Sequence, residues 1–170
     1  MKEVGHNLKE VQGSSMRLYL DICCLNRPFD EQSQERVRLE SEAVVYVLAS
    51  IQGGKNRLVG STILDFENSR NVNIDRQNRV RRVLELAKTY VEIGEQESHR
   101  AMAIAAMGFH ANDAMHIACA ESGGASYLLT TDDGFLRKGT RYKANLEVEI
   151  FNPIDWVREK ENESGIKNTK

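Results

Sequence analysis

Short apolar runs alternate along the chain with longer segments whose apolar residues repeat at helical spacing. Each run is apolar throughout and does not alternate with polar residues, which is typical of strands in a parallel sheet covered on both faces. Such a chain folds as an α/β protein, and we expect a three-layer α/β/α sandwich with a central, mainly parallel sheet. Strands are expected at residues 17–22, 56–61, 90–94, 126–131 and 148–151. Helices are expected at 31–52, 62–70, from 75 up to the strand at 90, at 95–107, at 113–122 with Asn112 as the N-cap, and at 155–160.

The chain is long enough, at 170 residues, to bury a core without disulfides or a structural metal. It has three cysteines, of which Cys23 and Cys24 are adjacent, so reduced thiols in the cytoplasm are expected rather than a secreted framework. No apolar run approaches the length of a membrane span, and no membrane association is expected. We expect a polar N-terminal leader at residues 1–16, one domain at 17–157 and a disordered tail at 158–170.

The net charge of −2 at pH 7 does not indicate a nucleic-acid-binding protein, although it does not exclude one. Basic residues are nevertheless concentrated between residues 70 and 88. A solvent-exposed helix face explains this cluster, and so does contact with RNA phosphates, which would give affinity without sequence recognition. The members that we predict to contact RNA are Arg76, Arg79 and Arg82.

Four acidic residues are expected at the carboxyl ends of strands or on helices beside them. In a parallel sheet these ends meet at one edge, where ligands bind. Ionised carboxylates about 5 Å apart repel by roughly 3 kcal/mol per pair at an effective dielectric constant near 20, so a cluster without a cation is costly. Oxygen ligands suit Mg²⁺ or Mn²⁺, which can activate water for the hydrolysis of a phosphodiester. The predicted catalytic and metal-binding residues are Asp21, Glu67, Asp113 and Asp132.

Each of these acids also has an explanation without function. Asp113 can be a favourable first-turn residue of a helix, where the helix dipole should keep it ionised. Asp132 can belong to a turn with Asp133, Glu67 can be an exposed helical residue, and Asp21 can be an unusual end of a strand. Together on one predicted edge, however, the four acids favour a shared site.

Four segments, taken in order, resemble the acidic blocks of the PIN-domain family, in particular the VapC-type toxin-like ribonucleases of toxin–antitoxin modules. They are RLYLDICCLNRPFD from Arg17, GSTILDFENSR from Gly60, GFHANDAMHIACAE from Gly108 and YLLTTDDGFLRK from Tyr127. The third and fourth segments are the most specific. The resemblance extends from about residue 17 to residue 157.

The resemblance implies a Rossmann-like fold and a Mg²⁺- or Mn²⁺-dependent endoribonuclease. It assigns the metal to the same four acids and adds Thr130 as a supporting hydroxyl. It further implies an RNA substrate, an antitoxin protein as partner and a homodimer. Where the family often carries Thr and then Asn or Ser after the first Asp, this chain has Ile22 and Cys23.

Other residues near these segments have competing interpretations. His116 follows Asp113 by one helical turn and is either a supporting residue of the metal site or a packed histidine. Cys23 and Cys24 are interpreted as small buried thiols and not as nucleophiles. Glu40 and Glu42 compete with Glu67 for the second acidic position, but surface pairing with Arg36 and Arg38 on the same helix explains them.

The sequence leaves more than one function open. The leading hypothesis is a ribonuclease in which a metal activates the attacking water, and the alternative is a catalytically inactive PIN-fold binding or regulatory protein. A phospho-accepting receiver domain also places acids at strand ends. It normally has a lysine at the end of its last strand, and the segment VEIFNP has none.

Overall fold

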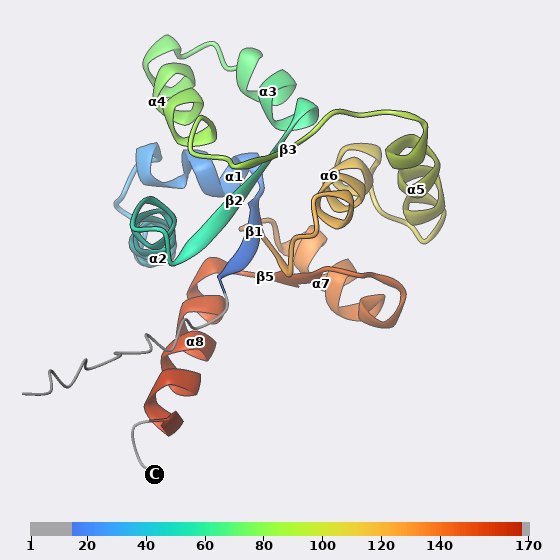
Figure 1. Cartoon of the computed structure of the whole chain (residues 1–170). Helices are drawn as coiled ribbons and strands as arrows, with labels where there is room; N and C mark the ends of the chain where they lie inside the picture. The colour runs from blue at the N-terminus through green and yellow to red at the C-terminus, as the bar shows by residue number, and fades with distance from the viewer. Residues whose placement is uncertain (1–14, 168–170) are drawn as a thin grey trace, which may run out of the picture.

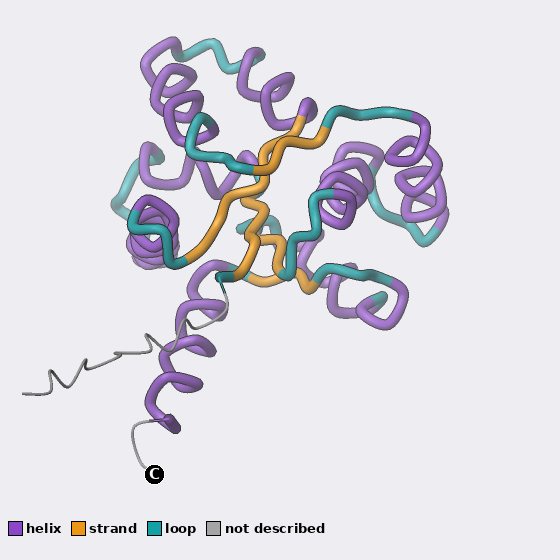
Figure 2. Tube along the Cα trace, viewed as in Figure 1, coloured by secondary structure: helices purple, strands orange, loops and turns teal. Residues whose placement is uncertain are grey.

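A sheet of five parallel strands forms the centre of the computed structural model, which describes residues 15–167 (Figure 2). The order of strands across the sheet is β3-β2-β1-β4-β5. This confirms the predicted α/β class, and the sheet is parallel throughout. The strands are β1 (Met16–Leu20), β2 (Asn56–Ser61), β3 (Thr89–Val91), β4 (Tyr127–Leu129) and β5 (Glu149–Phe151).

The chain leaves β1 in one direction along the sheet and later returns to its other side. β1 pairs with β2, where Leu18 lies opposite Leu58, and with β4, where Leu20 lies opposite Leu129. The order of strands thus reverses between β1 and β4, and their carboxyl ends flank the switch point. In open α/β sheets this is where ligands bind.

Helices cover both faces of the sheet. Figure 1 shows α1, α2, α4 and α8 on one side and α5, α6 and α7 on the other. The two layers complete the predicted sandwich. The helices are α1 (Ile22–Asn26), α2 (Glu35–Gln52), α3 (Thr62–Ser69), α4 (Ile74–Leu84), α5 (Glu95–Ala106), α6 (Ala111–Ser122), α7 (Asp133–Arg141) and α8 (Pro153–Lys167), with short 3₁₀ turns at Arg27–Phe29 and Lys143–Asn145.

Some boundaries differ from those expected. α2 begins at Glu35 because residues 31–34 form a turn that follows α1 and the 3₁₀ turn, and α6 is capped at His110, not at Asn112. α8 continues to Lys167, although a disordered tail was expected from residue 158. Its first turns bury Trp156 against the sheet, which anchors the helix. Most of the leader, residues 1–14, and the last residues, 168–170, lie outside the described part.

The core consists of the strand interiors and the inner faces of the helices. Leu18, Leu20, Leu58 and Leu128 are fully buried in the sheet. Burial of this apolar surface is the main favourable contribution to folding. Among the described helices, none has the length and apolar character that crossing a membrane requires.

Candidate metal site at the switch point

Asp21 is the first residue after β1 and also caps the helix that follows. Its Oδ1 accepts a hydrogen bond of 2.7 Å from the backbone N–H of Ile22, as an N-cap residue does. Its own N–H donates to the carbonyl of Leu129 at 2.9 Å, and its Oδ2 accepts from the Thr130 hydroxyl at 3.0 Å. Asp21 is therefore fixed by both strands of the switch point.

The thiol of Cys23 contacts both Asp21 and Thr130. Its Sγ donates to Oδ2 of Asp21 at 3.2 Å, lies 3.3 Å from Oγ1 of Thr130 and accepts from the N–H of Thr131 at 3.4 Å. Cys23 is partly exposed, so the expectation of a buried thiol holds for Cys24 but is wrong for Cys23. The thiol makes the contacts that a serine hydroxyl would make at this position.

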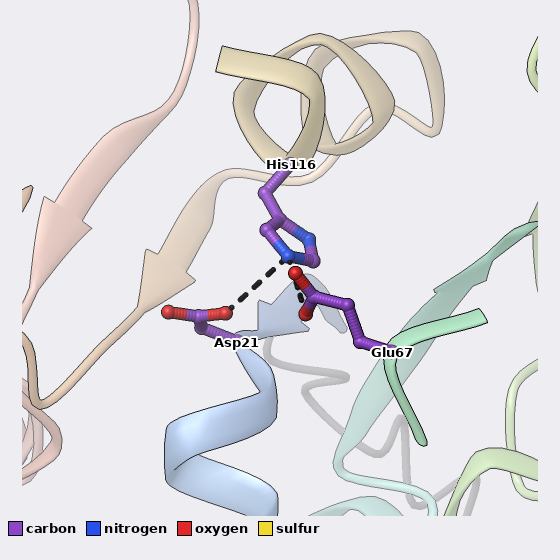
Figure 3. Close-up of side chains that lie close together, drawn as sticks. All are labelled: Asp21, Glu67 and His116. Atoms are coloured by element: carbon purple, nitrogen blue, oxygen red, sulfur yellow. Dashed lines mark hydrogen bonds and ion pairs between the residues drawn. The ribbon is translucent and has the colours of Figure 1, made fainter. Parts of the chain in front are cut away.

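Glu67 and His116 reach Asp21 from α3 and α6 (Figure 3). Nε2 of His116 lies 2.9 Å from Oε2 of Glu67 and 3.5 Å from Oδ1 of Asp21. Burial lowers the pKa of His116, but the hydrogen bond to Glu67 and the charge of Asp21 outweigh it, so the pKa is raised. Asn112, expected to cap α6, instead donates to Oε1 of Glu67 at 3.3 Å.

A buried chain of hydroxyl groups holds His116 from behind. Nδ1 of His116 lies 2.7 Å from the hydroxyl of Tyr19, and this hydroxyl lies 2.7 Å from Oγ of Ser61. Ser61 ends β2 and also accepts from the N–H of Leu64 at the start of α3. The orientation of the imidazole is thus set by two strands.

Asp113 and Asp132 complete the acidic edge. Asp113 lies in the first turn of α6 and is half-buried. Burial and the charges of Asp21 and Asp132 raise its pKa, opposite to the direction that the helix N-terminus alone favours. Asp132 caps α7 by accepting from the N–H of Phe135 at 2.8 Å, and its own N–H donates to Thr130.

The arrangement has the donor set of a metal site. One ligand atom from each of Asp21, Glu67 and His116 lies within 4.8 Å of the others. Two carboxylate oxygens and one imidazole nitrogen, with Asp113 and Asp132 nearby, fit a divalent cation. The structure therefore brings the four predicted acids and both predicted supporting residues, Thr130 and His116, to one edge of the sheet.

The three arginines predicted to bind RNA differ in their exposure and in their contacts. Arg76 is partly buried, where it pairs with Asp30 at 2.9 Å and donates to the carbonyl of Phe29. Arg79 lies over the ring of Phe29, with 5.2 Å between its guanidinium carbon and the ring centroid. Arg82 is exposed. Arg76 and Arg79 thus hold the α4 helix against the segment after α1.

The sequence pattern suggested that Glu40 is a surface residue, but the structure shows that it is not. It is fully buried on α2, where Arg27 lies 2.8 Å and Arg36 lies 2.9 Å from its carboxylate oxygens. Asn152 donates to it at 2.8 Å. The pairing with Arg36 was expected, but the burial and the contacts with Arg27 and Asn152 were not. With its charge satisfied in this way, Glu40 does not compete with Glu67.

Four residues that contact the site were not predicted for it: Tyr19, Ser61, Cys23 and Asn112. Two of them carried a usable signal. Tyr19 precedes Asp21 by two residues on a strand, so both side chains point to the same face. Ser61 is at the carboxyl end of β2, the same edge that led to the acids. Cys23 stands where the family often carries Asn or Ser, but its contacts with Thr130 and Thr131 depend on the close approach of the segment after β4.

The comparisons with known proteins agree with this fold. No curated protein sequence matches the chain. Among solved structures, it is similar to VapBC2 from Rickettsia felis bound to a DNA fragment from their promoter, with a TM-score of 0.50, 11% identity and coverage of 81% of this chain and 98% of the other. It is also similar to VapBC-1 from nontypeable Haemophilus influenzae, with a TM-score of 0.51, 18% identity and the same two coverages.

A family model supplies the assignment that these distant structural similarities do not. The model of the PIN domain matches residues 24–140. This range contains Glu67, Asp113 and Asp132, and it begins just after Asp21. The matched range is most of the chain, and the protein belongs to the PIN-domain family.

Proposed function

We propose that this protein is a metal-dependent endoribonuclease whose Asp21, Glu67, Asp113 and Asp132 hold Mg²⁺ or Mn²⁺. The observation that carries the proposal is the convergence of Asp21 and Glu67 on His116 at the switch point of a PIN fold. The charges of Asp21 and Asp132 raise the pKa of Asp113, which supports a common site for the three acids.

Each residue has a role that follows from its contacts. Thr130 and Cys23 hold Oδ2 of Asp21, which leaves Oδ1 directed towards His116. Asn112 holds one oxygen of Glu67 and leaves the other for the site. A divalent ion bound there would supply Lewis-acid chemistry, making water more acidic and offsetting the charge that develops on a phosphodiester. A side-chain nucleophile is not required.

The test is cleavage of generic single-stranded RNA by the full chain with Mn²⁺ or Mg²⁺. We expect cleavage by the wild type and its loss in Asp21→Asn, Glu67→Gln and Asp113→Asn. The matched control is Asp65→Asn, because Asp65 is an exposed acid on the same helix as Glu67. Circular dichroism verifies that each variant is folded.

The alternative, a catalytically inactive PIN-fold binding or regulatory protein, has one observation in its favour. His116 pairs with both Glu67 and Asp21, so these two acids are already compensated by a side chain. A folded wild type that binds RNA or protein but cleaves no RNA with either metal would establish this alternative.

For RNA binding we propose that Arg82, which is exposed on α4, contacts phosphates, whereas Arg76 and Arg79 hold this helix in place. Such contacts release counterions, so affinity should fall with salt. Arg82→Ala should reduce the slope of log K against log salt by about 1 and leave stability unchanged. Affinity that does not depend on salt would refute the role of the cluster.

We further propose a role as the toxin of a toxin–antitoxin pair. Both similar structures are of VapBC proteins. Induced expression in a bacterial host should arrest growth, and Asp21→Asn should not. Co-expression of the protein encoded by the neighbouring reading frame should restore growth, as expected of an antitoxin in the same cytoplasm.

Self-association is the last part of the proposal. Phe66, Val72 and Ile74 are exposed apolar residues around the junction of α3 and α4, which supports an interface there. Sedimentation equilibrium should show a homodimer that Val72→Asp dissociates. A wild type that remains monomeric at high concentration would exclude the homodimer.

A further inference from the structure

His116 projects into the acidic site as a buried nitrogen donor. It is 1% exposed, and its Nε2 lies 2.9 Å from Glu67 and 3.5 Å from Asp21. Its other ring nitrogen contacts the Tyr19 hydroxyl. Nε2 is therefore the ring nitrogen that faces the centre of the site, as Figure 3 shows.

A hydrogen atom or a cation must lie between Nε2 and the two carboxylates. The lone pair of a neutral imidazole would be repelled by the oxygens of Glu67 and Asp21, so these contacts require either a proton on Nε2 or a cation shared by all three groups. The ligand atoms lie within 4.8 Å of one another, which is close enough for one ion to contact each of them.

The support behind the ring can hold the tautomer of His116 that binds metals. If Nδ1 donates to Tyr19, the Tyr19 hydroxyl is free to donate to Ser61, which satisfies the buried chain in one direction. This leaves Nε2 without a proton and directed at the site. Histidines that bind metals are held in the same way, by a hydrogen bond from the second ring nitrogen.

We propose that Nε2 of His116 is itself a ligand, so that the divalent ion of this site is held by one imidazole nitrogen together with oxygens of Asp21 and Glu67. The inference rests on the proposed metal-dependent function and specifies its metal. Both ions accept oxygen ligands, but an imidazole nitrogen adds more to the binding of Mn²⁺, the first ion of the transition-metal affinity series, than to the binding of Mg²⁺, which demands oxygen ligands. The site therefore prefers Mn²⁺ to Mg²⁺ more strongly than an all-carboxylate site does.

The first experiment uses the wild-type chain and does not depend on activity. Pulsed electron paramagnetic resonance of bound Mn²⁺ should show the coupling of a directly coordinated nitrogen. In protein labelled only at histidine with ¹⁵N, this coupling should change to that of ¹⁵N. Bound Mn²⁺ without nitrogen coupling would overturn the inference.

The second experiment compares variants by titration with Mn²⁺ and Mg²⁺. His116→Gln should lose the nitrogen coupling and most of the preference for Mn²⁺. Tyr19→Phe keeps the aromatic ring of residue 19 but removes the hydroxyl that contacts Nδ1 of His116. This substitution should weaken Mn²⁺ binding by about 10- to 100-fold. The control is His99→Gln, because His99 is an exposed histidine on α5. Unchanged coupling in a folded His116→Gln variant would overturn the inference.

Failure of this inference can be distinguished from failure of the proposed function. RNA cleavage that requires a metal, in a protein whose Mn²⁺ has no nitrogen ligand, would refute the role of His116 and leave the ribonuclease intact. A folded protein that binds neither metal and cleaves no RNA would refute both.

Discussion

Arg36 on α2 binds the carboxylate of Asp133 with two parallel hydrogen bonds, 97 residues later in the chain. Nη1 donates to Oδ2 at 2.9 Å and Nη2 donates to Oδ1 at 2.7 Å. The Nε of the same guanidinium pairs with the buried Glu40. Because Asp133 directly follows Asp132, Arg36 connects the interior of α2 to the turn that carries a site acid.

Removal of Glu40 should therefore destabilise the fold. Glu40→Ala leaves Arg27, Arg36 and Asn152 without their shared partner, and we expect the free energy of unfolding to fall by about 3 kcal/mol. Urea denaturation measures the change. Glu42→Ala, an exposed glutamate on the same helix, should change stability by less than about 0.5 kcal/mol. Equal effects of the two substitutions would contradict the buried pairing.

Thr130 should support the site through its hydroxyl group. It donates to Asp21 and accepts from the N–H of Asp132, so Thr130→Val should weaken metal binding and RNA cleavage by about 10- to 100-fold. Thr130→Ser keeps the hydroxyl and should retain most of both. Calorimetric metal titration and initial cleavage rates measure the two effects. Thr140→Val on the exposed side of α7 is the control, and wild-type metal affinity in the Thr130→Val variant would rule out the support.

Cys23 should be the thiol that reacts first in the folded protein. It is partly exposed, whereas Cys24 and Cys119 are buried, and burial raises the pKa of Cys119 to about 12. A maleimide should label Cys23 alone and abolish cleavage, because the adduct would occupy the space beside Asp21. Cys23→Ser should cleave RNA and resist the reagent. Mass spectrometry locates the label, and prior labelling of Cys119 would contradict this order.

Glu97 should make stability depend on pH. Its carboxylate accepts from the Ser122 hydroxyl at 2.6 Å and from the N–H of Gly94 at 2.9 Å. These hydrogen bonds, with that of Ser122 the stronger influence, lower the pKa of Glu97 in the folded state. The stabilisation is therefore present above the unfolded pKa of about 4.3 and is lost as the pH falls through the lower folded pKa.

The measurement for Glu97 is urea unfolding of the wild type and Glu97→Gln at two pH values. At pH 7 we expect the variant to be less stable by about 1 kcal/mol, and the difference should shrink as the pH falls below the unfolded pKa of about 4.3. Glu95→Gln, in the same first turn but exposed, is the control. If the stability difference between the wild type and Glu97→Gln grows in acid, the pKa of Glu97 is not lowered by folding.

The arrangement of the sheet was predictable because it follows from local patterns. The runs around Leu18, Leu58 and Leu128 are apolar on both faces, and only a sheet covered by two helical layers buries them. The positions of Asp21 and Asp132 then followed from the rule that ligands bind at the carboxyl ends of parallel strands. These predictions needed no knowledge of side-chain packing.

Features that depend on contacts between distant segments were not predictable in the same way. Glu40 looks like a surface residue in its own helix, and its burial results from Arg27 and Asn152, which other elements bring to it. Arg76 looks like part of a basic surface, but Asp30 neutralises it across the fold. The helices α1 and α7 were not expected, since they are short and their packing stabilises them more than their sequence does.

The position of β1 between β2 and β4 also governs when the site can form during synthesis. Asp21 leaves the ribosome early, but the backbone of Leu129 and the hydroxyl of Thr130 that hold it are translated more than a hundred residues later. A nascent polypeptide that stops before β4 thus carries its first acid without the neighbours that orient it. The site, and any activity that depends on it, can therefore form only when translation is nearly complete.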